Sequence, residues 1–295
     1  MRLLDTIKAV SDYLEQSGVE DFLVDAELLA LHAAGIDRLR AYMENPVVDR
    51  RLLSLINRLM KRRAHGEPLQ YIIGHVDFLG LEIRVGKGVL IPRPETEMLV
   101  EEAIRTVNSK MLNVKSSEKT PSPFTLHPLA ILDLCTGSGC IALALAKEFP
   151  AAQVYATDVS AKAVKYAKGN AGLNGIKNAT FLKGPLFDPL EKHMRFDLIT
   201  ANPPYIRTSD IAGLQREVRD WEPDRALNGG EDGLDFYRKI LSRAAGYLKE
   251  RCYLLFELGV GQAEAVAEFA VNSGFNNVSI KKDFAGIERI LKAER

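Results

Sequence analysis

The sequence predicts an α/β fold, with a mostly parallel sheet covered by helices on both faces and a small helical domain before it. From residue 129 onwards, short apolar runs alternate with stretches of helical periodicity. Before residue 65, apolar side chains recur only at helical spacing, as at Leu52, Ile56 and Leu59. Repeated strand–helix–strand order builds a parallel sheet whose crossover helices cover both of its faces. The two patterns therefore predict two parts of different structural class.

The helical part is followed by two short β segments. Helices are expected at residues 3–17, 22–34 and 48–64, and β segments at 71–74 and 78–85 around a turn. From this we predict a helical domain over residues 1–70, a β-hairpin linker over 71–90 and the α/β domain over 91–295. Pro94 suits the first turn of a helix, and the polar stretch 108–128 is expected to be a surface loop.

The α/β domain alternates strands and helices to its end. The expected strands are 129–134, 153–158, 180–183, 196–201, 252–258, 278–282 and 287–291, and the expected helices are 141–149, 161–173, 235–248 and 261–272. Ligands of open α/β sheets bind outside the carboxyl ends of the strands. The residues that directly follow a strand are therefore the first candidates for a functional site.

Composition excludes several classes of protein. The formal net charge is zero, from 39 basic and 39 acidic side chains, which argues against a chain that coats nucleic acid along its length. The three cysteines lack paired metal-ligand spacing, which argues against a disulfide framework or a zinc site. No stretch approaches the roughly 20 apolar residues of a membrane span, and the N-terminus lacks the apolar core of a signal peptide. We expect a protein of the reducing cytoplasm.

A glycine turn joins the strand at 129–134 to the helix at 141–149. It reads Asp133-Leu134-Cys135-Thr136-Gly137-Ser138-Gly139-Cys140. Glycines let the backbone approach a ligand closely, and the N–H groups at the helix start favour an anionic group such as a carboxylate or phosphate. Asp158 ends the next strand, about 20 residues after Gly139, where its carboxylate can accept hydrogen bonds from a ribose diol.

Two nucleotide-bearing cofactors fit this turn. Residues 137–142 satisfy the dinucleotide fingerprint with alanine in its third place, so a nicotinamide-dependent dehydrogenase is one alternative. Asp133 favours the other alternative, S-adenosylmethionine. An acid at the end of the strand can pair with the amino group of the methionine part, whereas a pyrophosphate offers no such cation.

A second element, Asn202-Pro203-Pro204-Tyr205, follows the strand at 196–201. It suits a planar nitrogen, which is a poor nucleophile and has two N–H groups that need two acceptors. The side-chain oxygen of Asn202 and the carbonyl of Pro203 can accept them, and the Tyr205 ring can stack on the planar group. We therefore predict a methyltransferase in which Asn202, Pro203 and Tyr205 are catalytic, Pro204 completes the substrate clamp, and Asn202 also contacts the cofactor. These residues alone leave a protein amide and an adenine amine equally open as acceptors.

Motifs along nearly the whole chain add to this prediction. The most specific are residues 66–74, 91–97, 133–139, 202–205, 221–223, 229–237 and 257–259. Through them the chain resembles the glutamine-amide methyltransferases of the HemK type, which modify peptide chain release factors. The resemblance implies a class I methyltransferase dependent on S-adenosylmethionine, with a Rossmann-like seven-stranded sheet, a substrate-docking helical N-terminal domain and a hairpin linker.

The resemblance also implies the substrate, the glutamine of a Gly-Gly-Gln motif in peptide chain release factors, and hence a role in translation termination. Relatives that act on a ribosomal protein share the clamp, but the form of residues 93–97 favours the release-factor branch. Carried over by motif, residues 135–139 and Asp158 would bind the cofactor, and residues 202–205 would grip the glutamine amide. Leu186 lies where the family flanks the adenine.

The chain departs from the family pattern at Pro185, where an acidic residue is expected to contact the adenine. Asp188, three positions on, is the candidate that replaces this contact, so Asp188→Ala is expected to weaken cofactor binding. Cys135 and Cys140 are expected to pack and not to act as nucleophiles. Glu257 fits either a pocket carboxylate or a strand-end surface residue, and the sequence leaves both open.

A basic cluster lies near the end of the helical domain. It consists of Arg50, Arg51, Arg58, Lys61, Arg62 and Arg63. Charge runs of this kind are usually solvated helix faces, which is the favoured interpretation here. A docking surface for an acidic patch on a release factor is the alternative.

Overall fold

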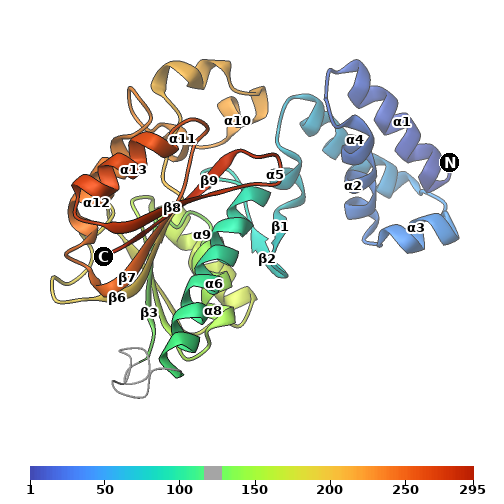
Figure 1. Ribbon diagram of the computed structural model, residues 1–295. Coiled ribbons are helices and arrows are strands. Elements are labelled where there is room, and N and C mark those ends of the chain that lie inside the picture. The colour runs from blue at the N-terminus through green and yellow to red at the C-terminus, as the bar shows by residue number, and fades with distance from the viewer. Residues whose placement is uncertain (116–127) are drawn as a thin grey trace. The chain divides into compact units, whose positions relative to one another are not determined.

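The computed structural model describes residues 1–115 and 128–295, with the side chains of 111–115 left out (Figure 1). Contacts divide the described chain into two compact units. The first holds Met1–His75 together with Gln215–Trp221, and the second holds Val76–Leu214 with Glu222–Arg295. The three-part division at residues 70 and 90 stays a prediction. Within the described part, no helix is both long and apolar enough to cross a membrane.

The first unit is helical, as its apolar spacing predicted. Its helices are α1 (Leu3–Gln16), α2 (Phe22–Ala34), α3 (Arg38–Glu44), α4 (Arg50–Ala64), α5 (Leu69–Ile73) and α10 (Arg216–Trp221). Leu3, Leu14, Leu29 and Ile56 are fully buried in its core. The carboxylate of Asp49 caps α4, because its Oδ1 accepts a 2.7 Å hydrogen bond from the backbone N–H of Leu52.

One local prediction in this region is wrong, and one short helix was not predicted. Residues 71–74 were expected as a β segment, but residues 71–73 belong to α5, and Gly74 caps that helix in the left-handed conformation with φ 94°. Ile72 has the β-branched character of a strand residue, but it is buried in the core of the helical unit. Tertiary packing has outweighed local propensity there. The short helix α3, which the apolar pattern did not indicate, is capped by Asp37 through the N–H of Arg40 at 2.7 Å.

The basic cluster is not one solvated face. Arg63 is only 8% exposed, and its guanidinium pairs with Asp25 at 2.5 Å and with Glu217 at 2.6 Å. Arg62 forms a two-point ion pair with Glu67. These two arginines therefore stabilise the unit, and only the remaining members are open to the docking alternative, which stays a prediction.

The second unit begins with a hairpin of β1 (His75–Phe78) and β2 (Leu81–Arg84). Its turn lies at Leu79 and Gly80, with φ 49° and 68°, and not between residues 74 and 78 as the sequence suggested. The outer edge of β2 is paired with side chains of α9 (Ala161–Leu173) and its C-cap, through Asn170 Oδ1 to Arg84 N at 2.9 Å and Asn174 Oδ1 to Glu82 N at 3.2 Å. An exposed strand edge is thereby covered.

A seven-stranded sheet forms the centre of the second unit, in the order β5-β4-β3-β6-β7-β9-β8. The strands are β3 (Ala130–Leu134), β4 (Gln153–Asp158), β5 (Ala179–Lys183), β6 (Phe196–Ala201), β7 (Leu248–Glu257), β8 (Asn276–Lys282) and β9 (Glu288–Glu294). The first five in spatial order are parallel, and β9 pairs antiparallel with β7 and with β8. The predicted α/β class with its mostly parallel, seven-stranded sheet is confirmed.

Helices cover both faces of this sheet (Figure 1). On one face α6 (Pro94–Lys115), α8 (Cys140–Glu148) and α9 pack together, and on the other α12 (Asp235–Ala244) packs with α13 (Ala263–Asn272). The short helices η1 (Thr208–Gly213) and α11 (Asp224–Leu227) lie in the connection between β6 and α12. The expected loop at 108–128 is wrong for residues 108–115, which continue α6 because no proline interrupts them. The rest of that loop falls largely outside the described residues.

Candidate active site

The register of the sheet brings four candidate residues into one row. The carboxyl ends of four parallel strands pair through Thr157, Leu134, Ala201 and Phe256. The next residues along β4, β3, β6 and β7 are, in that order, Asp158, Cys135, Asn202 and Glu257. The strand order reverses between β3 and β6, which is the topological switch point where ligands of such sheets bind. Residues from four separate parts of the chain therefore meet at one edge.

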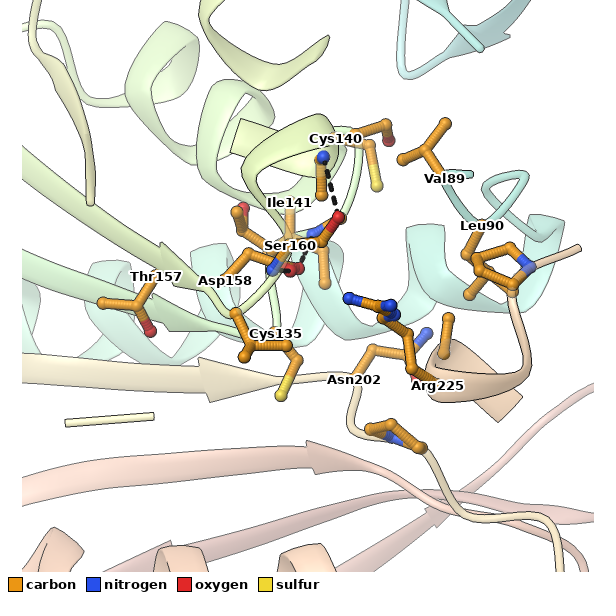
Figure 2. Close-up of a pocket in the computed structure, with 18 of the residues that line it drawn as sticks. Val89, Leu90, Cys135, Cys140, Ile141, Thr157, Asp158, Ser160, Asn202 and Arg225 are labelled. Carbon is orange, nitrogen blue, oxygen red and sulfur yellow. Dashed lines mark hydrogen bonds between the residues drawn. The ribbon is translucent and has the colours of Figure 1, made fainter. Parts of the chain in front are cut away.

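A cavity of about 270 Å³ opens at this edge, within the second unit (Figure 2). It is lined by residues of the segments 88–92, 135–141, 157–163, 185–186, 202–204 and 223–226, with Thr96 and Phe236. Apolar side chains form most of its wall, and a few polar groups, chiefly those of the glycine turn, Asp158 and Asn202, point into it. This combination is typical of a site for a small organic ligand.

The glycine turn takes a conformation that suits close approach to a ligand. Cys135, Gly137 and Gly139 all have positive φ, at 59°, 55° and 86°. A Cβ on Gly139 would lie 2.9 Å from the Cβ of Ala167, so this glycine lets α8 pack closely on α9. A Cβ on Gly137 would meet nothing within 4 Å, because the backbone there faces open space. The two glycines thus serve different purposes, helix packing for one and access for the other.

Asp158 is held by the backbone of the turns on either side of it. Its Oδ2 accepts from the N–H of Gly137 at 2.9 Å and its Oδ1 from the N–H of Ser160 at 2.7 Å. Burial raises the pKa of Asp158, and the backbone N–H groups of Ser160 and Gly137, followed by the positive charge of Arg225, oppose that shift. Figure 2 shows the Arg225 side chain reaching into the cavity between Asp158 and Asn202, a position that no sequence motif indicated.

Asp133 lies behind the cavity wall and not on it. Its side chain is fully buried and is not among the residues that line the cavity. Oδ1 accepts a 3.0 Å hydrogen bond from the hydroxyl of Thr200, and Oδ2 has no hydrogen-bond partner among the described residues. Burial raises the pKa of Asp133 to about 7, and the nearby hydroxyls of Thr136 and Thr200 oppose that shift. A direct contact between this carboxylate and a cofactor amine stays a prediction.

Replacing Asp133 with asparagine is expected to stabilise the protein at pH 8 more than at pH 5. The raised pKa means that the folded state binds the proton more tightly than the unfolded chain. Stability is therefore lost as the pH rises from the ordinary value of 3.8 to about 7. Each pKa unit corresponds to about 1.4 kcal/mol, so the penalty above pH 7 is on the order of a few kcal/mol. Urea unfolding of both proteins at the two pH values measures it, and an equal effect at both would contradict a buried, ionising carboxylate.

The Asn202-Pro203-Pro204-Tyr205 clamp is anchored at both of its ends. The Nδ2 group of Asn202 donates to the hydroxyl oxygen of Thr96 at 3.2 Å, and Oδ1 of Asn202 has no hydrogen-bond partner among the described residues. The hydroxyl of Tyr205 donates to Oε1 of Glu257 at 3.3 Å, and burial raises the pKa of this tyrosine. Both prolines are buried.

Glycines and one glutamine form a cradle around Tyr205. A Cβ on Gly229 would lie 2.7 Å from the Cα of Tyr205, and one on Gly233 would lie 2.5 Å from its carbonyl oxygen. A Cβ on Gly259 would lie 3.0 Å from its ring. Gln262 donates from Nε2 to the carbonyl oxygen of Tyr205 at 2.9 Å and accepts from the N–H of Gly259 at 3.1 Å. The glycine-rich segment 229–237 and the segment 257–262, far apart in the chain, therefore hold the clamp by close backbone contact.

Glu222 fastens the segment that forms another wall of the cavity. Its side chain is almost completely buried, accepts from the N–H of Ile91 at 3.1 Å and forms an ion pair with Arg93. The motif residues 91–93 and 221–223 are thereby tied together, although more than a hundred residues separate them in the chain. The neighbouring residues Leu90, Pro92 and Pro223 line the cavity.

The structure separates the predicted site residues into two groups. Those that line the cavity are Cys135, Thr136, Gly137, Ser138, Asp158, Leu186, Asn202 and Pro204. Those that do not are Asp133, Gly139, Pro203 and Tyr205, which lie behind or beside the wall. Sequence reasoning missed Thr96 and Arg225 and left Glu257 undecided. Thr96 lies within a recognised motif, and that was the only signal pointing to it.

The idea that Asp188 replaces the adenine contact is wrong. Asp188 is exposed, does not line the cavity, and pairs with Arg243 at 2.5 Å. Pro185 and Leu186 themselves line the cavity, and Leu186 takes a positive φ of 48°. The chain turns away from the cavity before Asp188, so apolar contact is what this segment offers a ligand.

Asp188→Ala is accordingly expected to leave cofactor binding unchanged. The substitution removes one exposed ion pair, which is worth about 0–1 kcal/mol of stability. Isothermal titration of the variant with the cofactor measures this, beside Asp158→Ala, which removes a cavity carboxylate and is expected to weaken binding. Weaker cofactor binding in the Asp188→Ala variant would instead support a contact between Asp188 and the adenine.

Comparison with known proteins shows the family of the chain. Residues 5–74 match the family described as PrmC N-terminal domain, and residues 122–216 match the family described as Methyltransferase small domain. A release factor glutamine methyltransferase of Thermodesulfovibrio yellowstonii is 44% identical, over 99% of this chain and 97% of its own length. One of Geobacter sulfurreducens is 43% identical, over 97% and 95%. The chain belongs to the release factor glutamine methyltransferase family.

Membership decides between the alternatives that the glycine turn left open. The enzyme is a methyltransferase, and the nicotinamide-dependent dehydrogenase is excluded. Among solved structures, the hMettl16 catalytic domain in complex with an RNA hairpin has a TM-score of 0.56 at 19% identity, over 80% of this chain and 81% of that one. At that identity the likeness concerns the fold alone. The resemblance stated from the motifs is thus confirmed for family and for fold.

Proposed function

We propose that this methyltransferase transfers a methyl group from S-adenosylmethionine to the side-chain amide nitrogen of the glutamine in the Gly-Gly-Gln motif of peptide chain release factors. The observation that carries the proposal is the position of Asn202. Its side chain lines the same cavity as the glycine turn and Asp158, and its Oδ1 has no partner among the described residues. A free acceptor for an amide N–H therefore lies beside the place where a nucleotide-bearing cofactor fits.

The residues of the cavity fit S-adenosylmethionine. Open space above Gly137 admits the ligand to the backbone of the turn, and Asp158 offers lone pairs to a ribose diol. Two buried hydroxyl oxygens that have no hydrogen-bond partner among the described residues belong to residues that line the cavity, Thr136 Oγ1 and Thr157 Oγ1. Such atoms favour a polar ligand that satisfies them. Pro185, Leu186 and Ile141 offer apolar surface to an adenine.

The clamp residues would orient the amide nitrogen of the glutamine. When bound, S-adenosylmethionine supplies a methyl group already activated by positively charged sulfur, so the acceptor nitrogen needs orientation more than activation. Oδ1 of Asn202 and the carbonyl of Pro203 would accept the two N–H groups of the glutamine amide. The Tyr205 ring would lie against the amide plane. Orientation of this kind can lower a barrier by about 7–11 kcal/mol.

Peptide mapping after methylation tests the proposal directly. The protein is incubated with isotopically labelled S-adenosylmethionine and a release factor, and mass spectrometry of the peptides locates the label. We expect the label on the glutamine of Gly-Gly-Gln, and none when that glutamine is replaced by asparagine. Parallel incubations contain ribosomal proteins and an adenine-containing oligonucleotide. Label only in one of these, or only at another residue of the release factor, would overturn the proposal.

Location and partner follow from the substrate. Release factors act on cytoplasmic ribosomes, so we place the reaction in the cytoplasm and take the release factor as a transient protein partner. The neutral net charge of the chain favours a protein substrate over a nucleic acid held along the surface.

A further inference from the structure

We propose that Thr96 and Glu257 are positioning residues, which fix the side-chain amide of Asn202 so that its oxygen, and not its nitrogen, faces the substrate. The inference rests on the proposed function, because it concerns how the same clamp is oriented. Neither residue is predicted to touch the reacting atoms. Their effect passes through Asn202.

A chain of three hydrogen-bonding side chains carries the inference. The hydroxyl of Thr96 donates to Oε2 of Glu257 at 2.7 Å, and the hydroxyl oxygen of Thr96 accepts from Nδ2 of Asn202 at 3.2 Å. Thr96 comes from the first turn of α6, Asn202 follows β6, and Glu257 ends β7. The register that pairs Ala201 with Phe256 brings the last two side by side.

The direction of the hydrogen bonds from Asn202 through Thr96 to Glu257 follows from the atoms that take part. The hydroxyl of Thr96 donates to Oε2 of Glu257, so its single proton is used there. The oxygen of Thr96 is then left as an acceptor, and only the Nδ2 end of the Asn202 amide can satisfy it. Oδ1 must therefore point the other way. A flipped amide would present N–H groups to the N–H groups of the glutamine, which cannot bond to one another.

Because these side chains are buried, water cannot easily take the place of the hydrogen bonds between them. Thr96 and Glu257 are each 2% exposed. Oε1 of Glu257 accepts from the hydroxyl of Tyr205, so one carboxylate holds both ends of the clamp. Burial raises the pKa of Glu257, while the hydrogen bonds from Thr96 and Tyr205 favour its ionised form. Thr96 and Tyr205 thus donate to different oxygens of the same carboxylate.

A pair of substitutions at Thr96 tests the proposal. Thr96→Val keeps the shape and removes the hydroxyl, and kcat for release-factor methylation is expected to fall by roughly 10²-fold, with the Kd for S-adenosylmethionine little changed. Thr96→Ser restores the hydroxyl and is expected to recover most of kcat. Thr106→Val on the same helix is the matched control, because Thr106 is also buried but its hydroxyl has no partner among the described residues. Its kcat is expected to equal that of the unaltered protein.

The second variant, Glu257→Gln, covers the case in which Thr96→Val does not fold. Glutamine has nearly the same shape, but its N–H group must face one of the two hydroxyls that both donate to Glu257. Either Thr96 or Tyr205 then loses its acceptor, so one end of the clamp is released and kcat is expected to fall, while cofactor binding and the thermal midpoint stay close to normal. Unchanged kcat in Thr96→Val or in Glu257→Gln would overturn the inference, as would equal losses in Thr96→Val and Thr96→Ser. If the unaltered protein fails to methylate the release factor, the proposed function fails instead.

Discussion

Asn202→Ala is expected to lower kcat for release-factor methylation by on the order of 10²–10³-fold, the usual cost of removing one preorganised polar group from a reacting centre. The variant loses the acceptor Oδ1, so one N–H of the glutamine amide has no fixed partner and the nitrogen is no longer held in place. The Kd for S-adenosylmethionine is expected to change little, because Asn202 is one of many residues that line the cavity. Steady-state kinetics with a release factor and isothermal titration with the cofactor measure the two effects separately.

The control for that experiment is Asn272→Ala. Asn272 is the exposed last residue of α13 and does not line the cavity, so its removal tests for a nonspecific effect of the substitution. An Asn202→Ala protein that turns over at the normal rate would remove the clamp from the mechanism. A protein whose cofactor affinity collapses together with kcat would show that Asn202 acts mainly on the cofactor.

Gly233→Ala is expected to reduce kcat by roughly 10²-fold through displacement of the clamp. The new Cβ would lie 2.5 Å from the carbonyl oxygen of Tyr205 and 2.7 Å from Nε2 of Gln262, so the 2.9 Å hydrogen bond between these two atoms cannot persist. The residue also has φ 78°, which L side chains rarely adopt, and this costs roughly a further 1–2 kcal/mol of stability. Enzyme kinetics and urea unfolding measure these two losses.

Gly261→Ala separates the two causes. Gly261 has a similar φ of 75°, but a Cβ there would meet nothing within 4 Å. This variant is expected to lose stability by the conformational strain alone and to keep a normal kcat. If Gly233→Ala loses no more activity than Gly261→Ala, the cradle around Tyr205 has no influence on the clamp.

Much of the fold followed from local patterns. The alternation of apolar runs and helical stretches after residue 129 predicted the parallel sheet, because each strand and each helix carries its own periodicity. The errors fell where tertiary contacts outweigh such patterns. Ile72 looks like a strand residue but is buried in the core of the helical unit, and Arg63 looks like a surface cation but pairs with Asp25 inside that unit.

The site could be predicted only as separate pieces. The glycine turn and the residues that follow β6 are contiguous motifs, so their chemistry can be inferred without knowing which distant residues contact them. Asp188 shows the limit of that reading. Its chemistry suited an adenine contact, but the chain turns away at Leu186 and directs the carboxylate to Arg243. A side chain's direction depends on backbone torsions that the residue type does not specify.

Contiguous residues with their own spacing were enough to predict the family and the α/β class, and they also gave the clamp at Asn202-Pro203-Pro204-Tyr205 as a hypothesis. The position of Glu257 depended on tertiary structure. The sequence left it as either a pocket carboxylate or a surface residue, and the parallel register of β6 and β7 places it beside Asn202, in reach of Thr96 and Tyr205. Register between strands is a long-range property, set by how buried faces pack and not by any local run of residues.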